Sequence, residues 1–105
     1  DTLIVPSNDA LDFSGIDNIS NVERLDLSVG DHAVTNLSVD DVINMTDSNQ
    51  LLEILGDATD TVGLIAGDWT ATGNTVVSDD GHSFAEYQDA AGSVTLLIED
   101  TITVS

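Results

Sequence analysis

The chain has 105 residues, 41% of them hydrophobic, and its twenty acidic residues face one basic residue, for a formal net charge of −19. Nucleic acids and anionic membrane surfaces require clustered Lys and Arg side chains, so this composition excludes both classes of partner. Cysteine is absent, which excludes disulfides, Cys-based zinc sites and thiol nucleophiles.

The length fits one domain, and the hydrophobic fraction is high enough for a modest core. Residues 1–105 are therefore predicted to form a single domain, and a monomer is expected. No apolar run approaches the roughly 20 residues of a membrane span, so membrane insertion is not expected. No signal peptide precedes Asp1, and the abrupt start reads as a segment of a longer protein.

The first third of the chain predicts short strands separated by turns. Residues 1–5 form a β-rich run that ends at Pro6, and residues 11–13 alternate apolar and polar side chains. Residues 22–29 are a strand candidate in which Leu25, Leu27 and Val29 share one face. Residues 30–32 predict a turn, and residues 33–35 a brief extended piece.

The strongest local signal is a helix that begins after Ser38. Ser38 is a favoured N-cap residue, and Asp40 and Asp41 lie in the first turn, where the helix dipole favours acids. Leu37 and Val42 have the spacing of a hydrophobic staple. The apolar face is predicted to hold Val39, Val42, Ile43 and Thr46, with Met45 beside them, and the helix should end near residues 47–49.

The apolar run at residues 51–55 has strand length, so the order strand, helix, strand predicts a parallel pair with a right-handed connection. Residues 61–65 should form the next strand. Beyond Gly67 the pattern predicts hairpins: a turn at residues 72–74, and a pair formed by residues 75–78 and 83–87 around Asp80-Gly81. Residues 94–98 and 102–104 complete an antiparallel meander.

These elements predict an α+β fold, in which a mixed β-sheet carries one short helix crossover at about residues 38–47 and ends in a C-terminal antiparallel meander. The sequence shows no internal repeat.

Oxygen ligands are plentiful, because sixteen of the twenty acids are Asp, a residue that suits both Ca²⁺ loops and tight turns. Asp57 and Asp60 place two carboxylates in one turn after a strand and are the first candidates for Ca²⁺. Asp9 and Asp12 form a second cluster, and Asp31 is a further candidate ligand. The alternative is an Asx-type turn in which Asp57 and Asp60 accept hydrogen bonds from local N–H groups. An acidic surface for a marine or halophilic environment is the alternative for the composition as a whole.

Catalytic signatures are absent from the sequence. The only histidines are His32 and His82, and no G-x-S-x-G elbow accompanies either of them. A Ser-His-Asp arrangement could be assembled on paper from Ser28 or Ser83, but such matches arise by chance in a chain this rich in Ser and Asp. The prediction is therefore that the protein is not an enzyme. Trp69 is interpreted as a packed side chain, with sugar stacking as the alternative.

Three stretches, residues 11–28, 36–64 and 78–100, together resemble a module of very large bacterial RTX adhesins. Their sequences are LDFSGIDNISNVERLDLS, NLSVDDVINMTDSNQLLEILGDATDTVGL and SDDGHSFAEYQDAAGSVTLLIED, about two thirds of the chain. Such modules share the order of a NIERIDL-like strand, a helix, a GDxxDTV turn and a DGxxY-type hairpin. Residues 1–3 also look like the tail of an RTX nonapeptide, without its glycine half.

The resemblance implies a secreted bacterial surface protein, exported by type I secretion, that depends on Ca²⁺ and acts in attachment or biofilm formation. This chain would be a non-enzymatic structural or scaffold module adjoining RTX repeats near the C-terminal end, and its partners would be neighbouring domains of the same protein. The alternative is a ligand-binding module that recognises a sugar or a peptide.

Overall fold

The structure, a computed structural model, describes residues 2–4, 10–15, 20–28, 30–46, 50–78 and 81–104. Within these ranges the chain forms one helix and ten strands, which follow one another as β1 (Thr2–Ile4), β2 (Ala10–Asp12), β3 (Arg24–Asp26), β4 (Ala33–Leu37), α1 (Val39–Met45), β5 (Leu51–Leu55), β6 (Thr61–Leu64), β7 (Thr70–Val77), β8 (Ser83–Gln88), β9 (Thr95–Glu99) and β10 (Thr103–Val104).

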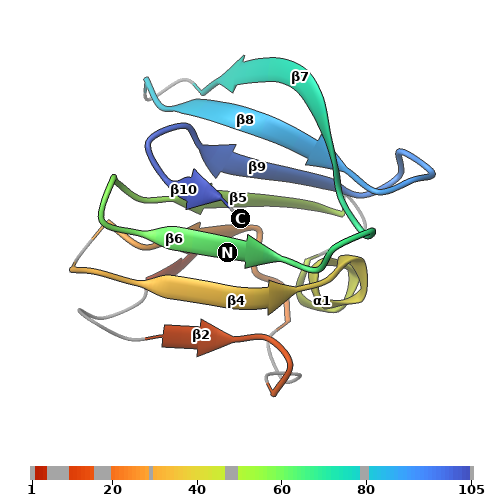
Figure 1. Cartoon of the computed structure of the whole chain (residues 1–105), viewed down its shortest axis with the longest axis horizontal. Coiled ribbons are helices and arrows are strands. Elements are labelled where there is room, and N and C mark those ends of the chain that lie inside the picture. Colours follow the sequence, from red (N-terminus) through yellow and green to blue (C-terminus); the bar gives the residue numbers. More distant parts are fainter. Residues whose placement is uncertain are drawn as a thin grey trace.

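The strands alternate between two sheets (Figure 1). The six-stranded sheet has the order β1-β3-β5-β9-β8-β7, and the four-stranded sheet has the order β10-β6-β4-β2. The pairs β1–β3, β3–β5 and β5–β9 are parallel, as are all the pairs of the four-stranded sheet. The chain therefore winds as a coil, and each turn of the coil gives one strand to each sheet.

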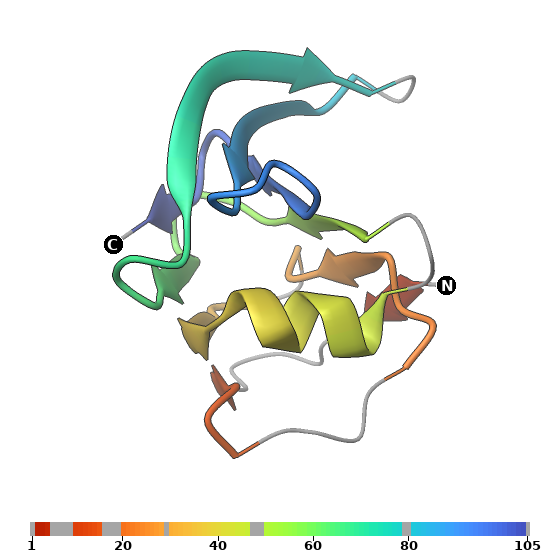
Figure 2. The same ribbon diagram turned by 90° about the vertical axis from the view of Figure 1, so that its right-hand side faces the viewer.

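Two insertions interrupt the coil. Helix α1 connects β4 to β5, and the antiparallel pair β7–β8 enters between β6 and β9. Figure 2 shows α1 lying along one side of the coil and β7 curving away from the rest of its sheet. The hairpin adds two antiparallel strands to the last parallel strand, β9, so the six-stranded sheet ends on this side in antiparallel pairs, with β7 as its edge strand.

The core lies between the sheets and is built from ladders of aligned apolar side chains. In the six-stranded sheet the successive parallel partners are Leu3, Leu25, Ile54 and Ile98. In the four-stranded sheet they are Leu11, Val34, Val62 and Val104. Side chains of both ladders share one hydrophobic cluster. Stacking equivalent residues lets each coil turn bury an apolar face that it could not bury alone.

Helix α1 confirms the predicted start. Ser38 is the N-cap, and it forms a capping box with Asp41. Val42 and Met45 are buried, whereas Ile43, predicted on the apolar face, is 39% exposed and points away from the core. The helix ends at Met45 with Thr46 as the C-cap, and the predicted end at residues 47–49 lies outside the described residues.

The predicted α+β class is confirmed: a mixed sheet, one short helix, a parallel β3–β5 pair and an antiparallel run of C-terminal strands. Three details differ. The strands divide between two sheets. Thr103 and Val104, predicted to complete the antiparallel meander, form β10, which pairs in parallel with β6 in the other sheet. The turn predicted at residues 72–74 lies within β7. There Gly73, with φ +83°, sits in a register shift between Ala71 and Thr75, so these residues form a bulge and the strand continues. No helix of the described residues has the length and apolar character needed to cross a membrane.

Candidate functional site

The turns that lead into β4, β6 and β10 lie above one another at one corner of the coil. The N–H of Thr61 donates to the carbonyl of His32 at 3.0 Å, and the N–H of Thr103 donates to the carbonyl of Asp60 at 3.2 Å. We call these residues, 31–32, 56–60 and 100–102, the turn stack. It contains Asp31, Asp57 and Asp60, three of the predicted metal ligands, from two different coil turns.

Asp60 is the centre of the turn stack, and its side chain is fully buried. One carboxylate oxygen, Oδ1, accepts the N–H of His32 at 2.9 Å, and Oδ2 accepts the N–H of Asp57 at 2.9 Å. A buried carboxylate is tolerated only with such partners. At Gly56 a Cβ atom would lie 2.6 Å from Asp60 Oδ2 and 2.9 Å from Ile102 Cδ1, so this position requires glycine.

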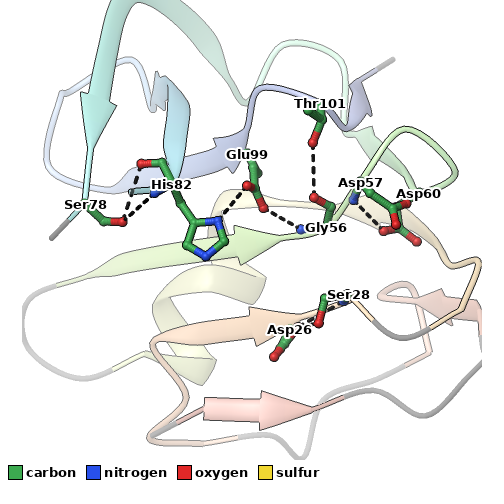
Figure 3. Close-up of polar contacts among 9 residues, drawn as sticks. All are labelled: Asp26, Ser28, Gly56, Asp57, Asp60, Ser78, His82, Glu99 and Thr101. Carbon is green, nitrogen blue, oxygen red and sulfur yellow. Dashed lines mark hydrogen bonds and ion pairs between the residues drawn. The ribbon is translucent and has the colours of Figure 1, made fainter. Parts of the chain in front are cut away.

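Asp57 is exposed and stabilises the same turn from outside. Its Oδ1 accepts the N–H of Thr59 at 3.0 Å and the Thr59 hydroxyl at 2.6 Å. The hydroxyl and then the N–H of Thr59 hold the pKa of Asp57 below its ordinary value, because both donate to the charged form. Asp57 and Asp60 thus make the local hydrogen bonds of the Asx-type turn that the sequence offered as an alternative to Ca²⁺. Figure 3 shows the bond between Asp57 and Asp60.

In this conformation both oxygens of Asp60 accept main-chain N–H groups. Calcium takes six to eight oxygen ligands, so Asp57 and Asp60 could supply only part of such a set. Across the described ranges no three His, Cys, Asp or Glu side chains form a group that could hold a metal ion. Calcium binding at Asp57, Asp60 and Asp31 remains a prediction.

The second predicted cluster divides into one described and one undescribed residue. Asp12 ends β2, is exposed, and accepts three hydrogen bonds at Oδ1: from Asn36 Nδ2 at 2.9 Å, and from the N–H and hydroxyl of Ser14 at 3.0 and 2.7 Å. The Asn36 amide, followed by Ser14, lowers the pKa of Asp12. Asp9 lies outside the described residues.

A second polar network joins the hairpin to the turn stack (Figure 3). His82 Nδ1 lies 2.7 Å from Glu99 Oε2, and Glu99 Oε1 accepts the N–H of Gly56 at 3.0 Å. The hydroxyl of Thr101 donates to the Gly56 carbonyl at 3.1 Å. Glu99 and Thr101 were not predicted as site residues, because only the fold brings them to Gly56, more than forty positions earlier. The network connects the residue before β8, the last residue of β9 and the residue after β5.

The hydroxyl groups of Ser28 and Ser78 form hydrogen bonds with residues close to them in the sequence. Ser28 donates both its N–H and its hydroxyl to Asp26 Oδ1, at 2.9 and 2.5 Å. Ser78 Oγ accepts the main-chain N–H of His82 at 3.3 Å, which closes the β7–β8 connection. The indole Nε1 of Trp69 donates to the carbonyl of Leu37 at 3.0 Å, and the ring packs against the core. Packing is therefore the role that the structure gives Trp69.

Acid is expected to remove the contribution of Asp57 to stability. Its pKa is lowered in the folded state, so this contribution is fully present above the unfolded value of about 3.9 and is lost as the pH falls through the folded value. Urea unfolding of the wild type and of Asp57→Asn, repeated from pH 7 to pH 2, measures it. The wild type should be more stable at pH 7, and the difference should vanish at the acid end. A difference that persists unchanged at pH 2 would contradict a role for the carboxylate charge.

Comparison with known proteins gives no relative: no family model matches the sequence, and no curated protein or solved structure is significantly similar to it.

Proposed function

We propose that this chain is a non-enzymatic structural module of a calcium-dependent bacterial surface adhesin of the RTX class, secreted by the type I route and acting in attachment or biofilm formation. The module would position neighbouring domains of the same protein. The observation that carries the proposal concerns one end of the two-sheet coil. This end is formed by β1 and β2, and no described strand pairs with the outer edge of either.

The burial of the ladder residues supports a docking role for this end. Leu25 and Ile54, inside the six-stranded sheet, and Val34, inside the four-stranded sheet, are fully buried. Leu3 and Leu11, at the β1–β2 end of the same ladders, are only partly buried. A further coil turn, with one parallel strand for each sheet, would complete both ladders. RTX nonapeptides form parallel β-helices, so they have the geometry that this end would accept.

The opposite end of the coil is asymmetric. There β9 pairs with β8 in the antiparallel sense, so the six-stranded sheet cannot continue as a parallel ladder beyond β9. Both β10 and β7 keep an edge to which no described strand pairs, but β7 is antiparallel to β8 and does not extend the parallel ladder. A full coil turn can therefore be added only at the β1–β2 end, which favours a module that terminates a coil on one side.

The proposed calcium dependence rests on charge. Twenty acids and one base on a chain of this size repel one another and oppose compaction. Arg24 pairs with Glu53 at 3.1 Å, across the β3–β5 pair, and no Lys is present to neutralise the remaining acids. Divalent cations outside the cell would reduce this repulsion, while the scarcity of free Ca²⁺ inside would leave it in place.

Calcium is expected to raise the melting temperature of the purified chain more than sodium at the same ionic strength. An increase of several degrees would correspond to about 1 kcal/mol for a domain of this size. Thermal melts in millimolar CaCl₂, in ionic-strength-matched NaCl and in chelator measure it. Equal melting temperatures in CaCl₂ and in matched NaCl would sink the calcium part of the proposal, leaving the coil-end argument to be tested separately.

If the chain is a structural module, we expect no binding on a glycan array. If it is a sugar-binding module, the alternative, we expect a saturable signal. The partly buried Trp69, whose indole is hydrogen-bonded to Leu37, supports the first outcome.

A further inference from the structure

We propose that β7 is a docking edge for an extended, basic polypeptide segment, which would add to the six-stranded sheet as a further strand. This inference does not depend on the coil-end proposal, because it concerns the opposite edge of the sheet. Strand addition of this kind derives its affinity from main-chain hydrogen bonds and its selectivity from the flanking side chains.

The length of β7 distinguishes it from the other edge strands. It has eight residues, whereas β1 and β2 have three each and β10 has two. Proteins commonly protect sheet edges by keeping them short, charged or interrupted by proline. The sequence of β7, TATGNTVV, contains no charged residue and no proline, and only Val76 is partly buried. Val77 is 65% exposed, a high value for a large apolar side chain.

The bulge divides β7 and leaves a regular free segment at its C-terminal end. In the bulge the Thr72 hydroxyl and Asn74 Nδ2 both donate to Glu86 Oε1, at 2.9 and 3.2 Å, which fixes that half of the strand to β8. Beyond the register shift, residues 75–77 pair in uninterrupted register with β8. The docking segment is therefore residues 75–77.

The hydrogen bonds of the hairpin show which main-chain groups face outward. The N–H of Ser78 donates to the carbonyl of His82 at 2.9 Å. Opposite residues of an antiparallel pair alternate between bonded and non-bonded positions, so Val76 is bonded to β8, whereas Thr75 and Val77 direct their N–H and C=O groups to the open edge. No described strand covers this edge, so these four groups can pair with an added strand.

The charge of the molecule favours a basic segment as the occupant. The docking segment is neutral, so a second strand can approach it without burying a charge of β7. The rest of the molecule is strongly acidic, and its single basic residue, Arg24, lies on β3, with β5, β9 and β8 between it and β7. A copy of this chain would bring its own net charge of −19 to the same surface. A segment with β-branched residues at its centre and Lys or Arg at its ends matches both features.

Fluorescence anisotropy with a labelled peptide, Lys-Val-Thr-Val-Thr-Val-Lys, tests the proposal. Binding should be saturable, and replacing both Lys residues by Glu should weaken it at least about tenfold. The double variant Thr75→Pro/Val77→Pro, which removes only outward N–H groups, should also lose about tenfold. The control Val77→Thr keeps the N–H and should bind within about twofold of the wild type.

Peptides that are N-methylated at alternate positions provide a measurement that needs no protein variant. An added strand turns every second N–H toward β7, so methylating one alternate set should abolish binding and methylating the other should spare it. Three results would overturn the proposal. They are an equal loss of binding for both methylated sets, binding that the proline substitutions leave unchanged, and equal binding of the Lys-flanked and Glu-flanked peptides. A dimer in sedimentation that the proline variant abolishes would also overturn it, because a second copy would then be the occupant.

Discussion

Replacing Asp60 with alanine is expected to lower the free energy of unfolding by about 3–5 kcal/mol, a large share of the stability of a domain of this size. The side chain is fully buried and accepts the main-chain N–H groups of His32 and Asp57, each at 2.9 Å. Its removal takes the acceptor away from the buried N–H of His32 and from the partly buried N–H of Asp57, and a buried donor without a partner costs about 1–3 kcal/mol. Urea unfolding at pH 7 measures the loss.

Two further variants separate this role from a loss of charge. Asp60→Asn keeps the shape but directs an amide NH₂ group at one of the two N–H donors, so its effect should lie between those of the wild type and Asp60→Ala. Asp100→Ala removes an equally charged, exposed side chain from the next turn of the stack and should change stability by less than about 0.5 kcal/mol. Similar losses for Asp60→Ala and Asp100→Ala would contradict the structural role of Asp60.

A gradient of stability along the six-stranded ladder is the second large expected effect. Ile54→Ala should cost about 3–4 kcal/mol, because Ile54 is fully buried and has Leu25 and Ile98 as parallel neighbours on either side. Leu3→Ala, in the same ladder but at its partly buried end, should cost about 1 kcal/mol. Chemical denaturation of both variants measures the difference.

Equal costs at Ile54 and Leu3 would show that the ladder does not end at β1 in the folded chain. Such a result would also remove the support that partial burial gives to a docking role for the β1–β2 end. Ile98 is fully buried and lies next to the antiparallel strand β8, so Ile98→Ala is the matched control. It should lower the free energy of unfolding by about as much as Ile54→Ala does.

Local signals in the sequence were enough to predict the helix and most of the strands. The N-cap Ser38, the acids of the first turn and the staple spacing all lie within a few positions of one another, so α1 could be predicted without knowing the fold. The turn at Asp57 and Asp60 was predicted for the same reason. The N–H of His32, which donates to Asp60, belongs to another coil turn. The role of Asp60 as the acceptor of this bond therefore could not be predicted from the sequence.

The second sheet and the coil were not predicted, because alternating apolar residues indicate a strand but not the sheet to which it belongs. The repeat is concealed by the two insertions. Leu3, Leu25, Ile54 and Ile98 occupy equivalent positions, but α1 separates the second from the third, and the β7–β8 hairpin separates the third from the fourth. Residues 72–74 have turn chemistry, yet the hydrogen bonds to Glu86 hold them in a bulged strand.

Several turn acids act in this conformation as hydrogen-bond acceptors. Hydrogen bonds from Asn36 and Ser14 lower the pKa of Asp12, those from Thr59 lower the pKa of Asp57, and those from Val94 and Ser93 lower the pKa of Asp89. The Asp-rich composition that suggested Ca²⁺ is therefore also the composition that a coil with many tight turns requires. Calcium, in the proposed function, is assigned to the charge of the whole module and not to these turns.

The parallel coil is the basis of the proposed function, and interstrand NOEs between backbone protons test it most directly. The structure predicts contacts between the ladder neighbours Leu25 and Ile54, and between Val34 and Val62, in the pattern of parallel strands. An antiparallel pattern between β3 and β5, or direct pairing of β3 with β4 in one sheet, would contradict the coil and with it the docking role of its β1–β2 end.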